Sequence, residues 1–297
     1  MTNAMPRLLI ADGNDRAGRD KRREALGRTT AQAFAAVVTA LAPSAECVLI
    51  EPADAEGGLP KGLGLHEADG LLFTGSTLRL TEGGPAVERQ LDLMRAAFAA
   101  GLPTFGSCWG IHVAAAAAGG RVGANPRGPE YGFARRLAAT SEGAAHPLLA
   151  GRGRAWDAPA IHTDSVLEPP PGARVLAANS VLDVQAIEIR HGNGLFWGTQ
   201  YHPEVDPDEL AAMLTLSAEG VVDAGLAADR AEVEAYADEI RALGETDPNA
   251  RQRLAWRHGV GAELLEAGQR RREIANFLAH LSTLRHTFAG ERDGVAR

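Results

Sequence analysis

The chain has only two cysteines, Cys47 and Cys108, among its 297 residues. Two are too few for the disulfide framework that stabilises small secreted domains. We therefore expect a reducing, cytoplasmic setting, in which a reactive thiol stays usable. Cys47 lies inside an apolar run and is expected to be a buried structural thiol.

Long apolar runs and an excess of positive charge are also missing. No stretch approaches the about 20 apolar residues of a membrane-spanning helix, and residues 1–6 lack the charge pattern of a signal peptide. We therefore expect no membrane partner. Acidic residues outnumber basic ones, 38 against 30, for a formal net charge of -8. Nucleic-acid-binding proteins are usually basic, so we expect no nucleic-acid partner either.

Short apolar runs alternate with helical patterns in the first part of the chain. Strands are expected at residues 7–11, 47–50, 70–73 and 102–105, and helices at 30–41 and 85–100. The charged stretch 12–23 is expected to be a surface loop. This alternation is typical of an α/β three-layer sandwich with a mainly parallel central sheet.

The pattern changes after residue 120 to short β-rich segments, and beyond Pro207 it becomes helical, with one helix expected to start at Asp247-Pro248-Asn249. We therefore divide the chain into a domain of residues 1–206 and a helical extension of residues 207–297. Apolar positions of the extension need a partner surface, which is either an edge of the core or a second copy in a homo-oligomer. These positions are Leu264, Leu265, Ile274, Phe277, Leu278 and Leu281.

Cys108 stands in the segment Gly106-Ser107-Cys108-Trp109-Gly110, between a predicted strand and an alanine-rich predicted helix. A strand that runs into Gly-x-Cys-x-Gly and then a helix is the pattern of a nucleophile elbow. A free thiol is mostly protonated at neutral pH, so a catalytic cysteine needs activation. The start of the following helix and a neighbouring histidine both favour the thiolate.

The base is expected from a second block far downstream, Gln200-Tyr201-His202-Pro203-Glu204. His202 is the candidate base, and Glu204 is expected to orient its ring. In an extended segment the His-x-Glu spacing puts both side chains on one side. The backbone N–H of Trp109 and the loop at Gly75 and Ser76 are the candidate oxyanion donors. The alternative interpretations are a buried structural thiol at Cys108 and a surface ion pair at His202.

Together these motifs resemble class I glutamine amidotransferases, over roughly residues 6–206. The resemblance rests on the cysteine elbow, on Thr74-Gly75-Ser76 upstream of it and on His202-Pro203-Glu204 downstream of it. Glu130-Tyr131-Gly132 and His162-Thr163-Asp164 resemble the GMP-synthetase-like branch of that family. The resemblance implies a flavodoxin-like glutaminase fold.

The resemblance also implies a reaction. Cys108 would attack the side-chain amide of glutamine, release ammonia and form a γ-glutamyl thioester, which water activated by His202 would hydrolyse. The ammonia would pass to an ATP-dependent synthetase. No phosphate-binding loop is found in the sequence, so that synthetase would be a separate polypeptide. No cofactor is expected, and no metal, because His, Cys and Asp do not cluster at metal-ligand spacing.

Substrate contacts are expected from five residues: Ser76, His112, His162, Thr163 and Asp164. His162 and Asp164 form either a pair in the pocket wall or only a hydrogen-bonded turn. His112 stands where the family usually has the glutamine that holds the substrate, and it either packs on the sheet or touches the substrate. Two further hypotheses therefore stay open. One is a γ-glutamyl hydrolase or peptidase with the same triad, and the other is a non-catalytic regulatory or assembly protein.

Overall fold

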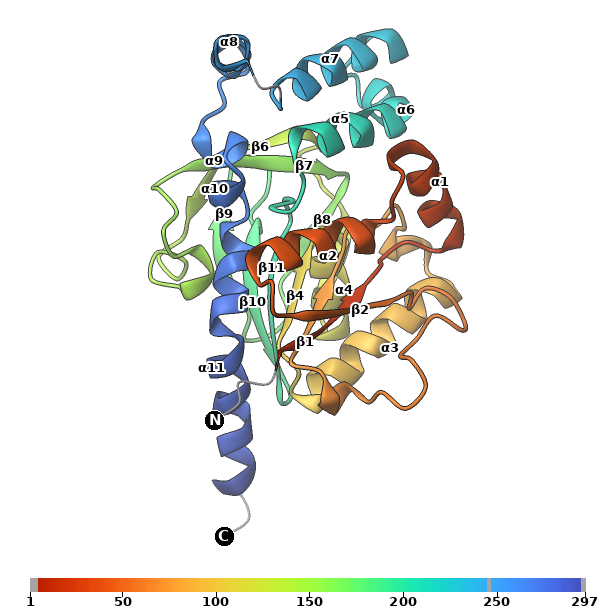
Figure 1. The fold of residues 1–297 in the computed structure, drawn as a ribbon, viewed down its shortest axis with the longest axis vertical. Coiled ribbons are helices and arrows are strands. Elements are labelled where there is room, and N and C mark those ends of the chain that lie inside the picture. The colour runs from red at the N-terminus through yellow and green to blue at the C-terminus, as the bar shows by residue number, and fades with distance from the viewer. Residues whose placement is uncertain (1–4, 245–246, 295–297) are drawn as a thin grey trace.

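The computed structural model describes residues 5–244 and 247–294 of the chain (Figure 1). Its strands are β1 (Arg7–Ala11), β2 (Glu46–Ile50), β3 (Gly70–Phe73), β4 (Thr104–Ser107), β5 (Arg121–Ala124), β6 (Glu130–Ala139), β7 (Trp156–His162), β8 (Asp164–Glu168), β9 (Arg174–Ala178), β10 (Ala186–His191) and β11 (Gly194–Thr199). Its helices are α1 (Arg16–Leu26), α2 (Thr30–Leu41), α3 (Pro85–Ala100), α4 (Trp109–Ala117), α5 (Pro207–Leu216), α6 (Ala218–Asp223), α7 (Arg230–Ala242), α8 (Pro248–His258), α9 (Ala262–Leu265), α10 (Ala267–Arg270) and α11 (Arg272–Gly294). None of the helices within these ranges has the length and apolarity that crossing a bilayer requires.

Nine strands form one sheet in the order β2-β1-β3-β4-β11-β10-β9-β6-β7. The first five run parallel, and the other four continue the sheet with antiparallel pairing. Strands β5 and β8 form a separate two-stranded ribbon. The predicted α/β class with a mostly parallel central sheet is confirmed. The parallel part holds β4 and β11, whose carboxyl ends carry the candidate catalytic groups.

Helices cover both faces of this sheet, and β1 illustrates how the sequence specifies the two faces. Leu8 and Ile10 pack with α2 and α11, whereas Leu9 and its neighbour Ala11 pack with α3 and α4. Successive side chains of a strand point to opposite faces, so a fully apolar strand indicates a sheet that is buried on both sides. The three-layer arrangement follows from this burial.

The expectation of a loop over residues 12–23 is wrong, because helix α1 begins at Arg16. Asp15 caps it by accepting a hydrogen bond from the Gly18 N–H, and Gly27 ends it in the left-handed conformation at φ 70°. Only Arg19 of this helix is buried. The helix therefore lacks the apolar stripe by which a sequence indicates a helix.

The C-terminal helices pack within the same chain, in two places. Helices α5 to α9 share a core with Phe133 of β6, and Leu264 belongs to that core. Ile274, Phe277 and Leu281 of α11 join the core between α2 and the sheet. Apolar positions of the extension therefore find a partner surface on the first 206 residues. The division of the chain into residues 1–206 and 207–297 stays a proposal. Its boundary is the point where helix α5 follows strand β11.

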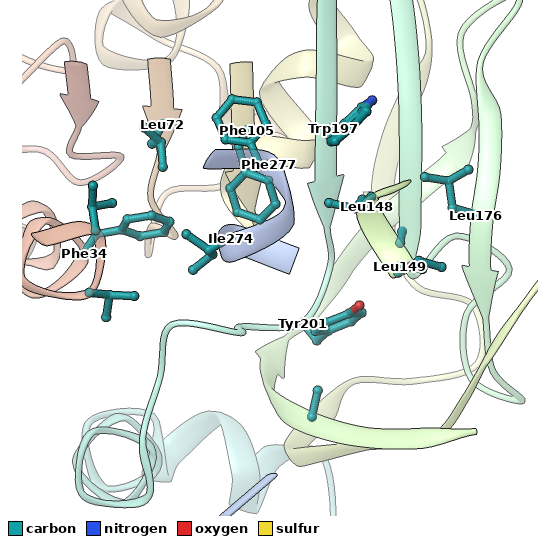
Figure 2. Packing of buried hydrophobic residues seen from close by; sticks show 14 of the residues in the cluster. Phe34, Leu72, Phe105, Leu148, Leu149, Leu176, Trp197, Tyr201, Ile274 and Phe277 are labelled. Carbon is teal, nitrogen blue, oxygen red and sulfur yellow. The ribbon is translucent and has the colours of Figure 1, made fainter. Parts of the chain in front are cut away.

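Helix α11 also braces the segment that carries the candidate base. Figure 2 shows Ile274 and Phe277 of α11 close to Phe105, with Tyr201 on the same side of the sheet. The Tyr201 hydroxyl donates to Glu273 Oε1 at 2.9 Å, and Arg152 pairs with the same buried carboxylate at 2.6 Å. Because Tyr201 directly precedes His202, this contact links α11 to the position of the histidine.

Phe277→Ala tests how much α11 stabilises the fold. The Phe277 ring is 1% exposed and lies 5.7 Å from the Phe105 ring and 6.2 Å from the Trp197 ring, measured between centroids. We expect the variant to lose about 3–5 kcal/mol of unfolding free energy in chemical denaturation. Trp256→Ala is the matched control, because Trp256 is 85% exposed, and we expect it to stay within about 0.5 kcal/mol of the parent. Equal stability of both variants would contradict the packing role of α11.

Candidate active site

Cys108 occupies a strained turn between β4 and α4. Its backbone angles are φ 49° and ψ -97°, which are uncommon for a residue other than glycine. A Cβ atom on Gly106 would lie 2.9 Å from Gly110 Cα, and one on Gly110 would lie 2.9 Å from Phe73 Cβ. Glycine is therefore required on both sides of Cys108. The Cys108 N–H donates to the Thr199 carbonyl at 2.8 Å, which ties the elbow to β11.

The two candidate partners of Cys108 lie together beyond the end of β11. His202 Nδ1 donates to Glu204 Oε1 at 2.8 Å, and both side chains are buried. Their arrangement differs from the extended segment expected from the sequence, because residues 202–205 form a turn closed by the Val205 N–H and the His202 carbonyl at 3.3 Å. The turn brings the carboxylate beside the ring, so the predicted contact exists for another reason than strand periodicity.

His202 is held in its protonated form. Burial by itself lowers the pKa of the ring, but the Glu204 carboxylate and the Cys108 side chain outweigh burial and raise the pKa to about 10. Among the described residues, Nε2 of His202 meets no hydrogen-bond partner, although Cys108 is near enough to influence the pKa. His202 and Cys108 line one cavity, and Nε2 is the ring nitrogen that Glu204 leaves without a bond.

Ser107 is a further member of the site that the sequence reasoning missed. Its Oγ donates to Glu204 Oε1 at 2.7 Å, so one carboxylate oxygen accepts from both the serine and His202. Ser107, the residue before Cys108, thereby holds the carboxylate that contacts His202. Its signal in the sequence was only its place in the elbow, since serine is common in turns of every kind.

The expected oxyanion loop lies against the catalytic pair. A Cβ atom on Gly75 would lie 2.8 Å from His202 Cε1 and 3.8 Å from Cys108 Cβ, so only glycine permits this approach. Trp109 is the first residue of α4, and its indole N–H donates to Gln90 at 2.8 Å, which holds the helix start. The Ser76 hydroxyl accepts from the Leu78 N–H at 3.0 Å and shapes the loop.

Two cavities meet at Cys108. The first, here called the α5 pocket, is lined by Cys108, His202 and Glu204 together with residues of α1, α2 and α5. The second, here called the Asp164 pocket, is lined by Cys108 and Trp109 together with Arg79, His112, Tyr131, His162, Thr163 and Asp164. His202 and Glu204 line only the first cavity, and the expected substrate contacts of residues 112 and 162–164 line only the second.

His162 and Asp164 line the Asp164 pocket, but each has its own partner. His162 Nε2 bonds Glu130 Oε2 at 3.0 Å, while the Asp164 carboxylate pairs with Arg79 at 2.5 Å. Both residues are in the pocket wall, but they bond to Glu130 and Arg79 rather than to each other. Thr163 is exposed and its hydroxyl lies 3.4 Å from an Asp164 oxygen. Arg79 was missed, because nothing in its sequence surroundings sets it apart from other surface arginines.

His112 is buried and neutral. Its Nε2 donates to Gln200 Oε1 at 2.8 Å, and burial lowers the pKa of the ring to about 4. The ring bonds Gln200 and also lines the Asp164 pocket, and its contact with a substrate stays a prediction. Gln200 is the first residue of the segment 200–204, and the sequence alone predicts no role for it. Its amide supplies the partner that keeps His112 in place.

Comparison with known proteins agrees with this geometry. The family described as "Glutamine amidotransferase class-I" matches residues 51–217, which is more than half of the chain. The chain belongs to the class I glutamine amidotransferase family. It is similar to the gamma-glutamyl-L-1-hydroxyisopropylamide hydrolase of a Pseudomonas species, with 34% identity over 278 residues that cover 93% of this chain and 92% of that protein.

Other members of the family are similar over shorter stretches or in fold alone. The glutamine-hydrolyzing GMP synthase protein of Ignicoccus hospitalis is 36% identical over 112 residues, which cover 38% of this chain and 56% of that one. The crystal structure of a glutamine amidotransferase from Thermotoga maritima superposes with a TM-score of 0.59 over 92% of this chain and 97% of that one. Because the sequence identity to the Thermotoga maritima protein is 14%, this structural similarity shows the fold alone. As a member of this family, the chain is a hydrolase or amidotransferase.

Glu204→Gln tests the coupling of base and carboxylate in this class I amidotransferase. Without the negative charge, the pKa of His202 should fall from about 10 by about 1–3 units, because an adjacent carboxylate favours the protonated ring. In the parent, the raised pKa stabilises the fold fully below about pH 6.5, the ordinary value. That stabilisation is lost as the pH rises toward about 10.

The measurement is an NMR titration of the His202 ring, combined with denaturation at pH 6 and pH 9. The parent should lose more stability between these pH values than Glu204→Gln does. Asp208→Asn is the control, because Asp208 is an exposed carboxylate of α5. An unaltered His202 titration in Glu204→Gln would contradict the assigned coupling.

Proposed function

We propose that this chain hydrolyses the side-chain amide of glutamine, or of a related γ-glutamyl amide, through a thioester on Cys108. The observation that carries the proposal is the hydrogen bond of His202 to Glu204 in the same cavity as the strained Cys108. A cysteine nucleophile, a histidine and an orienting carboxylate are the parts that acyl transfer through a thiol requires.

In the first step the Cys108 sulfur, as the thiolate, bonds to the γ-carbonyl carbon, and the carbonyl oxygen takes the negative charge. The backbone N–H groups of Trp109 and Gly75 are the proposed donors to that oxygen. The carbon–nitrogen bond then breaks, and the leaving nitrogen takes the proton of His202. The products of this step are ammonia or an amine and the γ-glutamyl thioester.

In the second step water attacks the thioester carbon and gives its proton to the neutral His202. The carbon–sulfur bond breaks, which releases glutamate and returns Cys108 and a protonated His202. Glu204 and Ser107 position the ring through both steps, since one carboxylate oxygen accepts from both residues. The non-catalytic hypothesis gives no reason for a strained cysteine beside a charged, buried histidine.

The proposed site for the γ-glutamyl end is the Asp164 pocket. Its ion pair offers one cationic and one anionic group, as a free α-amino acid requires. The Arg79 guanidinium suits the α-carboxylate, because its planar fork can donate two parallel hydrogen bonds. The Asp164 carboxylate suits the α-ammonium. His112, as a neutral ring, would contact the uncharged part of the chain between them.

A γ-glutamyl amide with a larger amine is the second candidate substrate. Two observations favour it: the similarity over almost the whole chain to a hydrolase named for a γ-glutamyl hydroxyisopropylamide, and His112 at the position where the family usually has glutamine. Both substrates would use the same triad and the same thioester. The two substrates differ only in the leaving group, which is ammonia for glutamine and an amine for the substituted amide.

The fate of the ammonia is the remaining part of the proposal. Relatives named as separate subunits of GMP synthase suggest an ATP-dependent synthetase as a partner in trans, although the match covers only 56% of one such relative. A cytoplasmic setting would keep the thiol reduced. A homo-oligomer through the C-terminal helices stays a further proposal, which analytical ultracentrifugation can test.

Cys108→Ala is the direct test of the reaction. The parent should release glutamate from glutamine or from γ-glutamyl amides, and it should form a thioester that mass spectrometry detects after acid quenching. Cys108→Ala should lose thioester formation and at least about 10³-fold in rate, because no other group can form the acyl intermediate. Cys47→Ala is the control, since Cys47 lies on β2, away from both pockets. Equal rates in Cys108→Ala and the parent would contradict the proposal.

Arg79→Ala tests the site proposed for the γ-glutamyl end. Loss of a charge-assisted contact to the α-carboxylate should raise KM about tenfold or more for every γ-glutamyl substrate. Arg121→Ala is the matched control, because Arg121 is an exposed arginine in an ion pair with Glu168 and lines neither pocket. A KM that Arg79→Ala leaves unaltered would move the γ-glutamyl site elsewhere.

A further inference from the structure

The α5 pocket is larger than the hydrolysis of glutamine itself requires. Its volume of about 130 Å³ is much larger than ammonia needs, because one water-sized molecule occupies only about 10–15 Å³ by the same kind of measure. The cavity lies directly beside the nucleophile, and His202 and Glu204 are in its wall. A space of this size next to the reacting atoms calls for a ligand group.

We propose that the α5 pocket binds the amine portion of an N-substituted γ-glutamyl amide, and that this portion is short, aliphatic and uncharged. The inference rests on the proposed function, which it deepens by naming the class of the leaving group. It concerns the cavity at Cys108 that is lined by His202 and Glu204, not the Asp164 pocket.

The position of the base decides which end of the substrate lies in which cavity. The leaving nitrogen must take a proton from His202, so it has to lie on the side of Cys108 that faces this ring. His202 lines the α5 pocket and is absent from the wall of the Asp164 pocket. The acyl chain therefore extends into the Asp164 pocket, and a substituent on the nitrogen extends into the α5 pocket.

The wall of the α5 pocket suits an aliphatic group. Ala33 of α2, Val205 and the pair Met213 and Leu216 of α5 contribute apolar side chains. Methionine adapts to ligands of different shape, because its side chain is unbranched and flexible. Burial of each further carbon of a substituent against this wall should therefore strengthen binding.

Glu204 and Glu209 each meet two donors inside the protein, whereas Asp164 of the other pocket pairs with one cation, Arg79, whose side chain is 43% exposed. Glu209 pairs with Arg22 of α1 and, at 3.6 Å, with Arg28. Glu204 accepts from His202 and Ser107. An ammonium group at the end of the substituent would be buried without a counter-charge, which is unfavourable.

The ion pair of Arg22 and Glu209 is part of the cavity wall. It joins α1 to α5, which lie side by side above the carboxyl ends of the parallel strands (Figure 1). Both groups are largely buried, so the pair holds the two helices at a fixed separation. The space between them and Cys108 is thereby part of the folded structure.

A substrate series on the unaltered protein is the first test. Glutamate, the shared product, is measured with glutamine, γ-glutamylmethylamide, γ-glutamylpropylamide and γ-glutamyl-2-aminoethylamide. The kcat/KM should rise along the first three, to about tenfold or more above glutamine for the propylamide. The 2-aminoethylamide has the shape of the propylamide and adds one positive charge, and its kcat/KM should be about tenfold lower than that of the propylamide.

Met213→Trp and Met213→Ala are the second test. Tryptophan should fill the α5 pocket and reduce the kcat/KM ratio of propylamide to glutamine at least about fivefold, whereas alanine should shift the preference toward longer substituents. Asp208→Ala is the matched control, because Asp208 lies on the exposed side of the same helix and lines neither pocket. It should keep the ratio of the parent.

The outcomes separate this inference from the proposed function. Glutamate from glutamine with no gain for the methyl or propyl substrates would overturn the amine pocket and leave the proposed function intact. Equal use of the charged and uncharged substrates of the same shape would overturn the assignment to uncharged amines. No glutamate from any substrate would overturn the proposed function itself. The substrate series uses the unaltered protein, so it tests the amine pocket even if Met213→Trp does not fold.

Discussion

The backbone of Cys108 is the constraint on which the rest of the site depends. A non-glycine residue at φ 49° costs about 1–3 kcal/mol, and it persists only where its surroundings leave no alternative. Gly106 and Gly110 allow β4, α4 and β3 to approach closely, and the bond from Cys108 to Thr199 ties the turn to β11. This geometry places the sulfur where two cavities open and where the segment after β11 supplies the histidine.

Features of the site with a local cause could be predicted from the sequence. Strands β1 and β3 follow from short, mostly apolar runs, and the elbow follows from glycines on both sides of Cys108. The contact of His202 with Glu204 was also expected, although a turn rather than a strand produces it. Helix α1 was missed because its residues are charged and its cap, Asp15, resembles any loop aspartate.

Features that depend on packing across long separations could not be predicted. Arg79 meets Asp164 only because the loop after β3 folds over the start of β8, and Ser107 reaches Glu204 only because β4 pairs with β11. The sequence pattern indicated that the apolar positions of α11 need a partner surface, but not which one. The structure places them between α2 and the sheet, with Glu273 holding the residue beside the base.

The contribution of α11 to the catalytic segment has a consequence for synthesis in the cell. Nucleophile, oxyanion loop and base all leave the ribosome before α11 does, yet Tyr201 finds its buried partner only on Glu273. During translation the sheet therefore exposes an apolar face, and His202 lacks its brace, until the last helix docks. Docking of α11 covers this face and brings Glu273 to Tyr201.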